Sequence, residues 1–132
     1  MVRTSPNGDM AECIEHCLAC YRSCLETATR HCLEAGGAHV DPSHFRLMLN
    51  CAEICRTAAE FMMSKSAFHA KLCAVCADVC EACAESCRNI GEMDECARAC
   101  EQCAASCGAM ASQPRGPVQL EPLLTHPKAH LT

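Results

Sequence analysis

Residues 73–87 read CAVCADVCEACAESC, a run in which cysteine returns at every third or fourth position. Alternating steps of three and four place these side chains on one face of an α-helix, at the a and d positions where a bundle helix normally carries Leu or Ile. Residues 13–24 (CIEHCLACYRSC) and 96–107 (CARACEQCAASC) repeat the pattern. The three runs supply the candidate ligands Cys13, Cys17, Cys20, Cys24, Cys73, Cys76, Cys80, Cys83, Cys87, Cys96, Cys100, Cys103 and Cys107.

A fourth stripe of residues at helical spacing is poorer in cysteine. It contains His44, Met48, Cys51, Cys55, Ala58 and Met62. Cys32 follows the first run but lies roughly 90° from its stripe at about 100° per residue, and His31 lies on the stripe instead. The spacing therefore leaves open whether Cys32 is a ligand, and we include it among the candidates together with Cys51 and Cys55.

Start and stop signals predict four helices and no strand. Asp9 with Glu12 forms a capping box, and Asp41-Pro42 is an N-cap followed by proline. Gly36-Gly37 and Gly91 end helices. The expected helices are residues 9–35, residues 41–63, a third from the turn at 64–66 to 89, and a fourth from 92 or 94 to 112. Short connections favour an all-α, antiparallel up-down-up-down four-helix bundle with a Cys-lined core over residues 1–112. The Pro-rich segment 113–132 is expected to be extended or disordered.

The composition indicates a narrow core and a reduced protein. Among 132 residues there are 21 Ala and 16 Cys but only 21 Leu, Ile, Val and Phe together, and no Trp.

The net charge of −5, without a basic stripe, argues against nucleic-acid binding, and no apolar run is long enough to cross a membrane. Residues 1–9 lack the apolar region of a secretory signal, so we expect a cytoplasmic protein. Cysteine at this density in that compartment favours metal binding over disulfides.

The cysteine spacing favours Cu(I) and many ions of it. Cys-x-x-x-Cys pairs place two thiols on one helix face with Cβ atoms about 5–6 Å apart. Cu(I) selects thiolates and accepts two or three of them, whereas Zn²⁺ takes four in a tetrahedron. Four Zn²⁺ on sixteen thiolates would leave about eight buried negative charges, whereas one Cu(I) per thiolate leaves none. We therefore expect about 16 Cu(I) per chain, with a storage or buffering role and no enzymatic activity.

Methionine and histidine gather at the two ends of the expected bundle. Thioethers and imidazoles hold Cu(I) more weakly than thiolates, which suits a port for copper uptake. We assign that port to the end at which the first helix begins, with Met10, Met62, His69 and Met110 as its ligands. The opposite end collects His31, His44, Met48 and Met93. His16 and His39 are expected on a helix flank and a loop, and His126 and His130 in the C-terminal segment.

Over residues 9–112 the repeated Cys-x-x-x-Cys pairs on four helices resemble those of the cytosolic branch of the bacterial copper storage proteins. The resemblance implies a four-helix bundle packed with Cu(I)-thiolate sites and assembled into homotetramers. It also implies copper uptake at the end where the first helix begins, which corresponds here to Met10. This chain departs from the family pattern in its cysteine-poor second helix, its off-stripe Cys32 and its Pro-rich C-terminal segment.

Other functions remain as alternatives. Zn²⁺ or Ag⁺ storage uses the same thiols. An iron–sulfur protein shares the Cys-x-x-Cys spacing but places it in loops, with a final Cys before Pro. A thiol oxidoreductase needs one distinct pair at a helix N-terminus. Same-helix cysteines four apart are poorly placed for disulfides, and a copper transfer protein exposes a single two-cysteine site on a loop, which is absent here.

Overall fold

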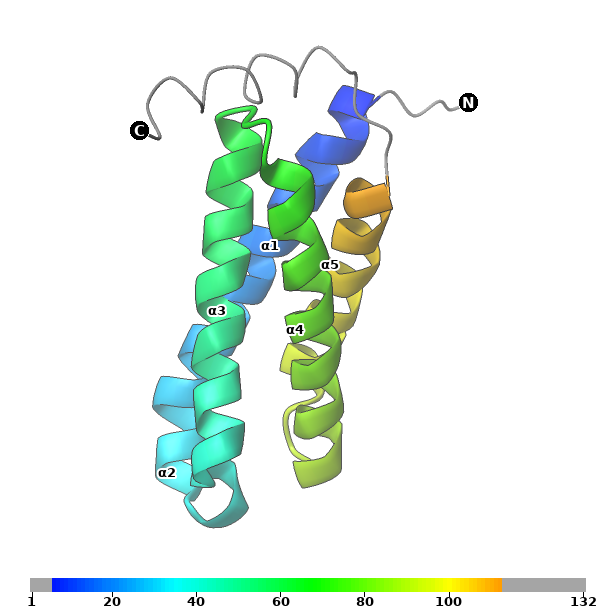
Figure 1. Ribbon diagram of the computed structural model, residues 1–132. Coiled ribbons are helices and arrows are strands. Elements are labelled where there is room, and N and C mark those ends of the chain that lie inside the picture. The colour runs from blue at the N-terminus through cyan, green and yellow to red at the C-terminus, as the bar shows by residue number, and fades with distance from the viewer. Residues whose placement is uncertain (1–5, 113–132) are drawn as a thin grey trace, which may run out of the picture.

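The computed structural model describes residues 6–112, with side chains from Asp9 onward, and within them the fold is entirely helical. The predicted four-helix bundle is confirmed (Figure 1). The predicted C-terminal segment 113–132, with His126 and His130, lies outside the described residues. The long helices are α1 (Pro6–Glu26), α3 (Pro42–Met63), α4 (His69–Ile90) and α5 (Asp94–Ser112).

Figure 1 shows the chain descending in α1, rising in α3, descending in α4 and rising in α5. Helix α1 packs against α3 and α5, and α4 packs against the same two helices. The beginning of α1 and the end of α5 therefore lie at the same end of the bundle as the α3–α4 connection. Within residues 6–112 every helix is too short or too polar to cross a membrane.

Two of the four predicted helix starts are confirmed. Asp41 caps α3 by accepting a hydrogen bond from the backbone N–H of His44 at 3.4 Å, with Pro42 at the first helical position. Helix α5 begins at Asp94, one of the two positions expected. Gly91 follows α4 with φ 96°, a conformation that glycine adopts without steric penalty.

The other two starts were predicted wrongly. Helix α1 begins at Pro6, so Asp9 lies inside its first turn rather than at its N-cap. Proline fits the first turn because it has no N–H to leave unpaired. Helix α4 begins at His69 rather than after Ser66. Lys65 is in the left-handed region at φ 55°, and Ser66 Oγ accepts from the backbone N–H of Phe68 at 3.0 Å, which extends the turn by two residues.

The first predicted helix is not one continuous α-helix, because its winding changes near its end, which the cysteine spacing did not predict. After α1 the chain forms a π-helical segment, Thr27–Cys32, and then the short α2, Leu33–Ala35. A π-helix bonds residue i to i+5, so each residue turns by less than 100°. Cys32 therefore occupies the next core position after Ala28 and is fully buried, while His31 is partly exposed. The expectation that His31 lies on the stripe and Cys32 off it was therefore wrong.

The core is as narrow as the composition indicated. Within the described residues every buried hydrophobic side chain is Cys, Ala or Met. Many larger aliphatic and aromatic side chains pack around this centre in partly buried positions, as Ile14, Leu18 and Leu72 do, and others are exposed. Each cysteine in place of leucine or isoleucine forgoes burial worth about 0.8 kcal/mol per methylene. A core of cysteine thiols therefore contributes less hydrophobic free energy to folding than a core of leucine and isoleucine would.

Candidate metal centre

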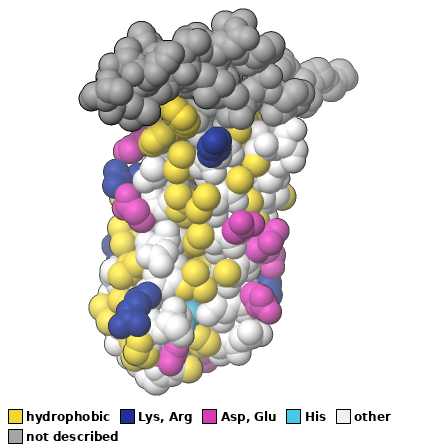
Figure 2. Space-filling view, in the orientation of Figure 1, with side chains coloured by type: hydrophobic (Ala, Val, Ile, Leu, Met, Phe, Trp, Pro, Cys, Tyr) yellow, Lys and Arg dark blue, Asp and Glu magenta, His cyan; other side chains and the backbone are white. Residues whose placement is uncertain are grey.

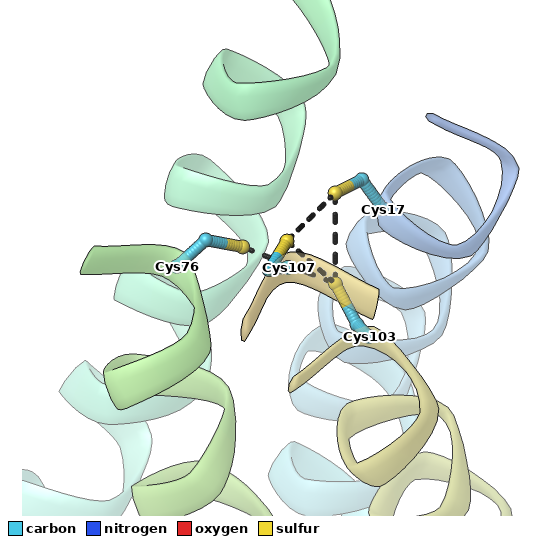
Figure 3. A group of neighbouring side chains, drawn as sticks. All are labelled: Cys17, Cys76, Cys103 and Cys107. Atoms are coloured by element: carbon cyan, nitrogen blue, oxygen red, sulfur yellow. Dashed lines mark hydrogen bonds between the residues drawn. The ribbon is translucent and has the colours of Figure 1, made fainter. Parts of the chain in front are cut away.

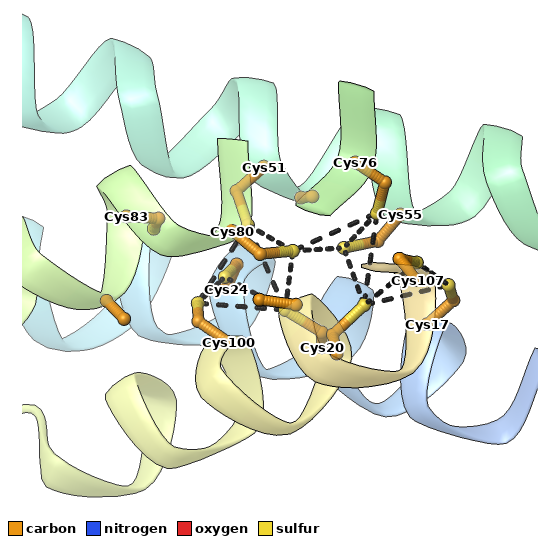
Figure 4. Close-up of a cluster of buried hydrophobic side chains, with 14 of the residues drawn as sticks. Cys17, Cys20, Cys24, Cys51, Cys55, Cys76, Cys80, Cys83, Cys100 and Cys107 are labelled. Carbon is orange, nitrogen blue, oxygen red and sulfur yellow. Dashed lines mark hydrogen bonds between the residues drawn. The ribbon is translucent and has the colours of Figure 1, made fainter. Parts of the chain in front are cut away.

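All sixteen cysteines are buried free thiols, and their Sγ atoms follow the axis of the bundle; we call them the sulfur row. Neighbouring sulfurs from different helices lie 3.4–4.0 Å apart, much farther than the S–S bond of a disulfide at about 2.05 Å. The Cys20 thiol donates to Cys100 Sγ at 3.7 Å, and its sulfur lies 3.8 Å from Cys51 and 4.0 Å from Cys80. Cys20 thereby links α1 to α3, α4 and α5 (Figure 4).

The sulfurs form groups that share members. Cys17, Cys76, Cys103 and Cys107 converge within 4.8 Å of one another (Figure 3). Cys103 also belongs to a second group with Cys20, Cys55 and Cys80, and Cys20 belongs to a third with Cys24, Cys51 and Cys100. Because adjacent groups share a cysteine, separate tetrahedral ions cannot fill all of them at once. The overlapping groups therefore form one continuous row of thiols rather than isolated sets of four.

The row continues toward the end where α4 meets α5. The thiols of Cys83 and Cys87 donate to Met48 Sδ at 3.6 and 3.4 Å. Cys32 donates to Met93 Sδ at 3.6 Å, and its sulfur lies 4.0 Å from His44 Nε2. The sequence placed Met48, Met93 and His44 at this end without including them among the candidate ligands. The contacts of Cys32 depend on the π-helical register, which carries no simple sequence signal.

No buried cation balances these sulfurs, since the only buried polar side chains among residues 9–112 are His39 and His44. Burial raises the pKa of the Cys32 thiol and lowers the pKa of His44, so both groups favour their neutral forms. Within the row, hydrogen bonds from Cys100 and then Cys24 lower the pKa of Cys83 to about 6. The hydrogen bond with Cys20 raises the pKa of Cys100. Hydrogen bonds between neighbouring sulfurs thus shift the pKa values of Cys83 and Cys100 in opposite directions.

The residues predicted for the uptake port lie at the end where α1 begins. Met62 and Met110 are buried, each 1% exposed, and Met10 and His69 are partly exposed. His69 Nδ1 lies 2.9 Å from the carbonyl oxygen of Ser66, which holds its ring at the start of α4. A surface pocket beside Met110 is lined by His16 and Glu12. This end therefore has two partly exposed donors and two buried thioethers.

A family model described as copper storage protein matches residues 7–112. Among solved structures, a protein of Nitrosospira multiformis is 52% identical with a TM-score of 0.79, over 80% of this chain and 97% of that chain. The Cu(I)-bound copper storage protein BsCsp3 of Bacillus subtilis is 38% identical with a TM-score of 0.73, over 79% of this chain and 99% of that chain.

A curated relative is also similar, over a shorter length. It is a cysteine-rich protein of Bacillus subtilis that is 39% identical over 61 residues. The match spans 46% of this chain and 56% of that relative, so a little more than half of its length is covered.

Proposed function

This chain belongs to the copper storage protein family, and from that premise we propose that it stores many Cu(I) ions along the sulfur row. The observation that carries the proposal is the sharing of Cys20 and Cys103 between neighbouring four-cysteine groups. A bridging thiolate serves two Cu(I) ions, each of which takes two or three sulfurs. Three Zn²⁺ ions with four separate thiolates each would need twelve cysteines, and the three overlapping groups contain ten.

Charge balance supports the same metal. A row of buried thiols is neutral when protonated, and each Cu(I) that replaces one proton leaves it neutral. One Zn²⁺ on four thiolates would replace four protons with two charges and leave two negative charges without a buried cation nearby. We expect loading to release close to one proton per Cu(I), beginning at sulfurs whose pKa is lowered by hydrogen bonds from their neighbours, as for Cys83.

We propose all sixteen cysteines as the copper ligands, Cys32 included. Its burial and its contact with Met93 support its inclusion. We further propose that copper enters at the end where α1 begins, at which Met10 and His69 are partly exposed and Met62 and Met110 are buried. Thioether and imidazole donors bind Cu(I) weakly enough to pass it to the thiolates.

An anaerobic titration of the reduced protein with Cu(I), against a coloured Cu(I) chelator, tests the storage proposal. We expect tight uptake of about 16 Cu(I) per chain and a colourless product. Saturation at four or fewer would mean discrete sites and would exclude storage along the row. A brown product would indicate iron–sulfur chemistry. Ag⁺ is expected to fill the same sites, and a parallel Zn²⁺ titration is expected to stop at a much lower ratio.

We propose a cytoplasmic location and a storage rather than a catalytic role. Free thiols persist in reducing compartments, and all sixteen cysteines are free. A saturated row also leaves no open coordination position of the kind that metal catalysis needs. Fractionation of the native host's cells, with antibody detection, checks the location.

We also propose assembly into homotetramers, which rests on the family resemblance. Figure 2 shows a band of hydrophobic side chains running along the face formed by α3 and α4. Exposed large side chains on these helices include Leu49, Met63 and Val75. Such a face suits packing against further copies. Light scattering coupled to size-exclusion chromatography is expected to give the mass of four chains, and a monomer mass would exclude the assembly.

A further inference from the structure

At the end of the bundle opposite the proposed uptake port, three irregular segments bring nitrogen and oxygen donors together. His31 comes from the π-helical segment, His39 from the 3₁₀ turn Gly37–Val40, and Glu92 from the α4–α5 connection. One donor atom from each lies within 4.8 Å of the other two. His39 Nε2 is 3.6 Å from a Glu92 carboxylate oxygen, and the His31 and His39 rings meet edge to face with centroids 4.9 Å apart.

Two ring nitrogens in this cluster lack a partner. His31 Nε2 and His39 Nδ1 are both buried atoms without any hydrogen bond. The His39 side chain is only 10% exposed, so water does not readily satisfy it. An unpaired buried polar atom is costly, and most such atoms in native proteins have a partner. The unpaired His31 Nε2, next to the His39 ring and Glu92, is therefore a free donor for a ligand at this end of the bundle.

The donor set indicates which ligand it is. Two imidazoles and a carboxylate are the donors that Zn²⁺ and related borderline divalent cations accept, commonly with water as the fourth ligand. Cu(I) prefers sulfur, and the adjacent residues supply it: Cys32 and Met93 turn inward, where the thiol donates to Met93 Sδ at 3.6 Å. Soft donors thus face the core, and the harder donors next to them in the chain lie outside.

We propose that His31, His39 and Glu92 form a separate site for one borderline divalent cation of the Zn²⁺ type. The Glu92 side chain is 76% exposed, so the ion reaches the site from solvent without passing through the sulfur row. The three donor atoms lie within 4.8 Å of one another, and both the imidazoles and the carboxylate close on the ion to reach the usual bond lengths of about 2.0–2.2 Å. The bound ion ties the π-helical segment, the 3₁₀ turn and the α4–α5 connection together. The site does not depend on copper storage.

Co²⁺ titration of the Cu(I)-loaded protein tests this site, because loading occupies the thiols that would otherwise bind Co²⁺. The copper content is measured first, so that a failure to load is recognised separately. We expect one Co²⁺ per chain, with visible d–d absorption and no thiolate-to-Co²⁺ charge-transfer band, and displacement by Zn²⁺. His39→Ala and Glu92→Gln are each expected to weaken binding at least about 10-fold while copper content stays unchanged.

Two matched variants serve as controls. His16→Ala removes a histidine that contacts Ser106 outside the cluster, and the double variant His126→Ala/His130→Ala removes the histidines of the C-terminal segment. Both are expected to bind Co²⁺ as the original protein does. Equal binding by His39→Ala, loss of binding in either control, a charge-transfer band, or no saturable Co²⁺ binding would each overturn the proposal.

Discussion

Replacement of Cys103 by alanine distinguishes between two ways of binding copper: along one shared row of sulfurs, or in independent groups of four cysteines. The Cys103 thiol donates to Cys17 Sγ at 3.6 Å and lies 3.7 Å from Cys55 and 3.9 Å from Cys107. It belongs to two of the four-cysteine groups at once. In a shared row its neighbours still bridge, so the loss is expected to be one or two Cu(I) out of about 16. If each four-cysteine group instead held its copper as an all-or-none cluster, both groups that contain Cys103 would fail and about four or more Cu(I) would be lost.

The same change has a calculable effect on the metal-free protein. Cys103 is fully buried, and removal of an atom the size of a methylene loses about 0.8 kcal/mol of burial. The small cavity that remains raises the free-energy loss to about 1–1.5 kcal/mol. For a bundle of this length we expect the melting temperature to fall by about 4–8 °C. The helical content at low temperature should not change.

Copper content after anaerobic loading and gel filtration, together with thermal unfolding followed by circular dichroism, measures both effects. Cys32→Ala is the matched control, because Cys32 lies in none of the four-cysteine groups and contacts Met93 instead. It is expected to lose at most one Cu(I). A loss of four or more Cu(I) in Cys103→Ala would refute the shared row, and unchanged capacity would show that Cys103 carries no copper.

Three further predictions concern the metal-free protein and its loading. Burial raises the pKa of Cys32 and lowers that of His44. At these two groups the folded state therefore binds more protons than the unfolded state above about pH 9 and fewer below about pH 6.5. The melting temperature should therefore be highest between these limits and fall on both sides; a flat profile would contradict the assignment. Met110→Leu should slow Cu(I) uptake several-fold in stopped-flow measurements without changing the number of Cu(I) bound. Met63→Leu, at an exposed methionine, should change neither the rate nor the number. Equal uptake rates for the two variants would show that Met110 is not part of the port. The reduced, metal-free protein should already be helical by circular dichroism because its caps and heptads do not depend on metal, and a coil spectrum would refute this.

The stripes of cysteine and most helix ends could be predicted because they are local properties of the chain. Steps of three and four assign a helix face without reference to other helices. Asp41-Pro42 and Gly91 act through their own backbone conformations. The narrow core followed from composition, since alanine and cysteine are the only small apolar residues present in quantity.

The remaining features depend on packing between helices. The π-helical segment Thr27–Cys32 contains neither Pro nor Gly, so no residue in it signals the change of winding that brings Cys32 into the core. The sharing of Cys20 and Cys103 between groups depends on how far each helix is displaced along the axis relative to its neighbours. His39 was expected in a loop and lies instead in the short 3₁₀ helix Gly37–Val40, where it is buried next to Glu92 of the α4–α5 connection.

The map of anomalous scattering at the copper edge, from crystals of the fully loaded protein, tests the central claim most directly. We predict a row of copper peaks inside the bundle, extending from the level of Cys13 to that of Cys32, with peaks between sulfurs that belong to two groups. Copper confined to one end of the bundle or to its surface, or four well-separated peaks each within its own set of four sulfurs, would contradict storage along a shared row.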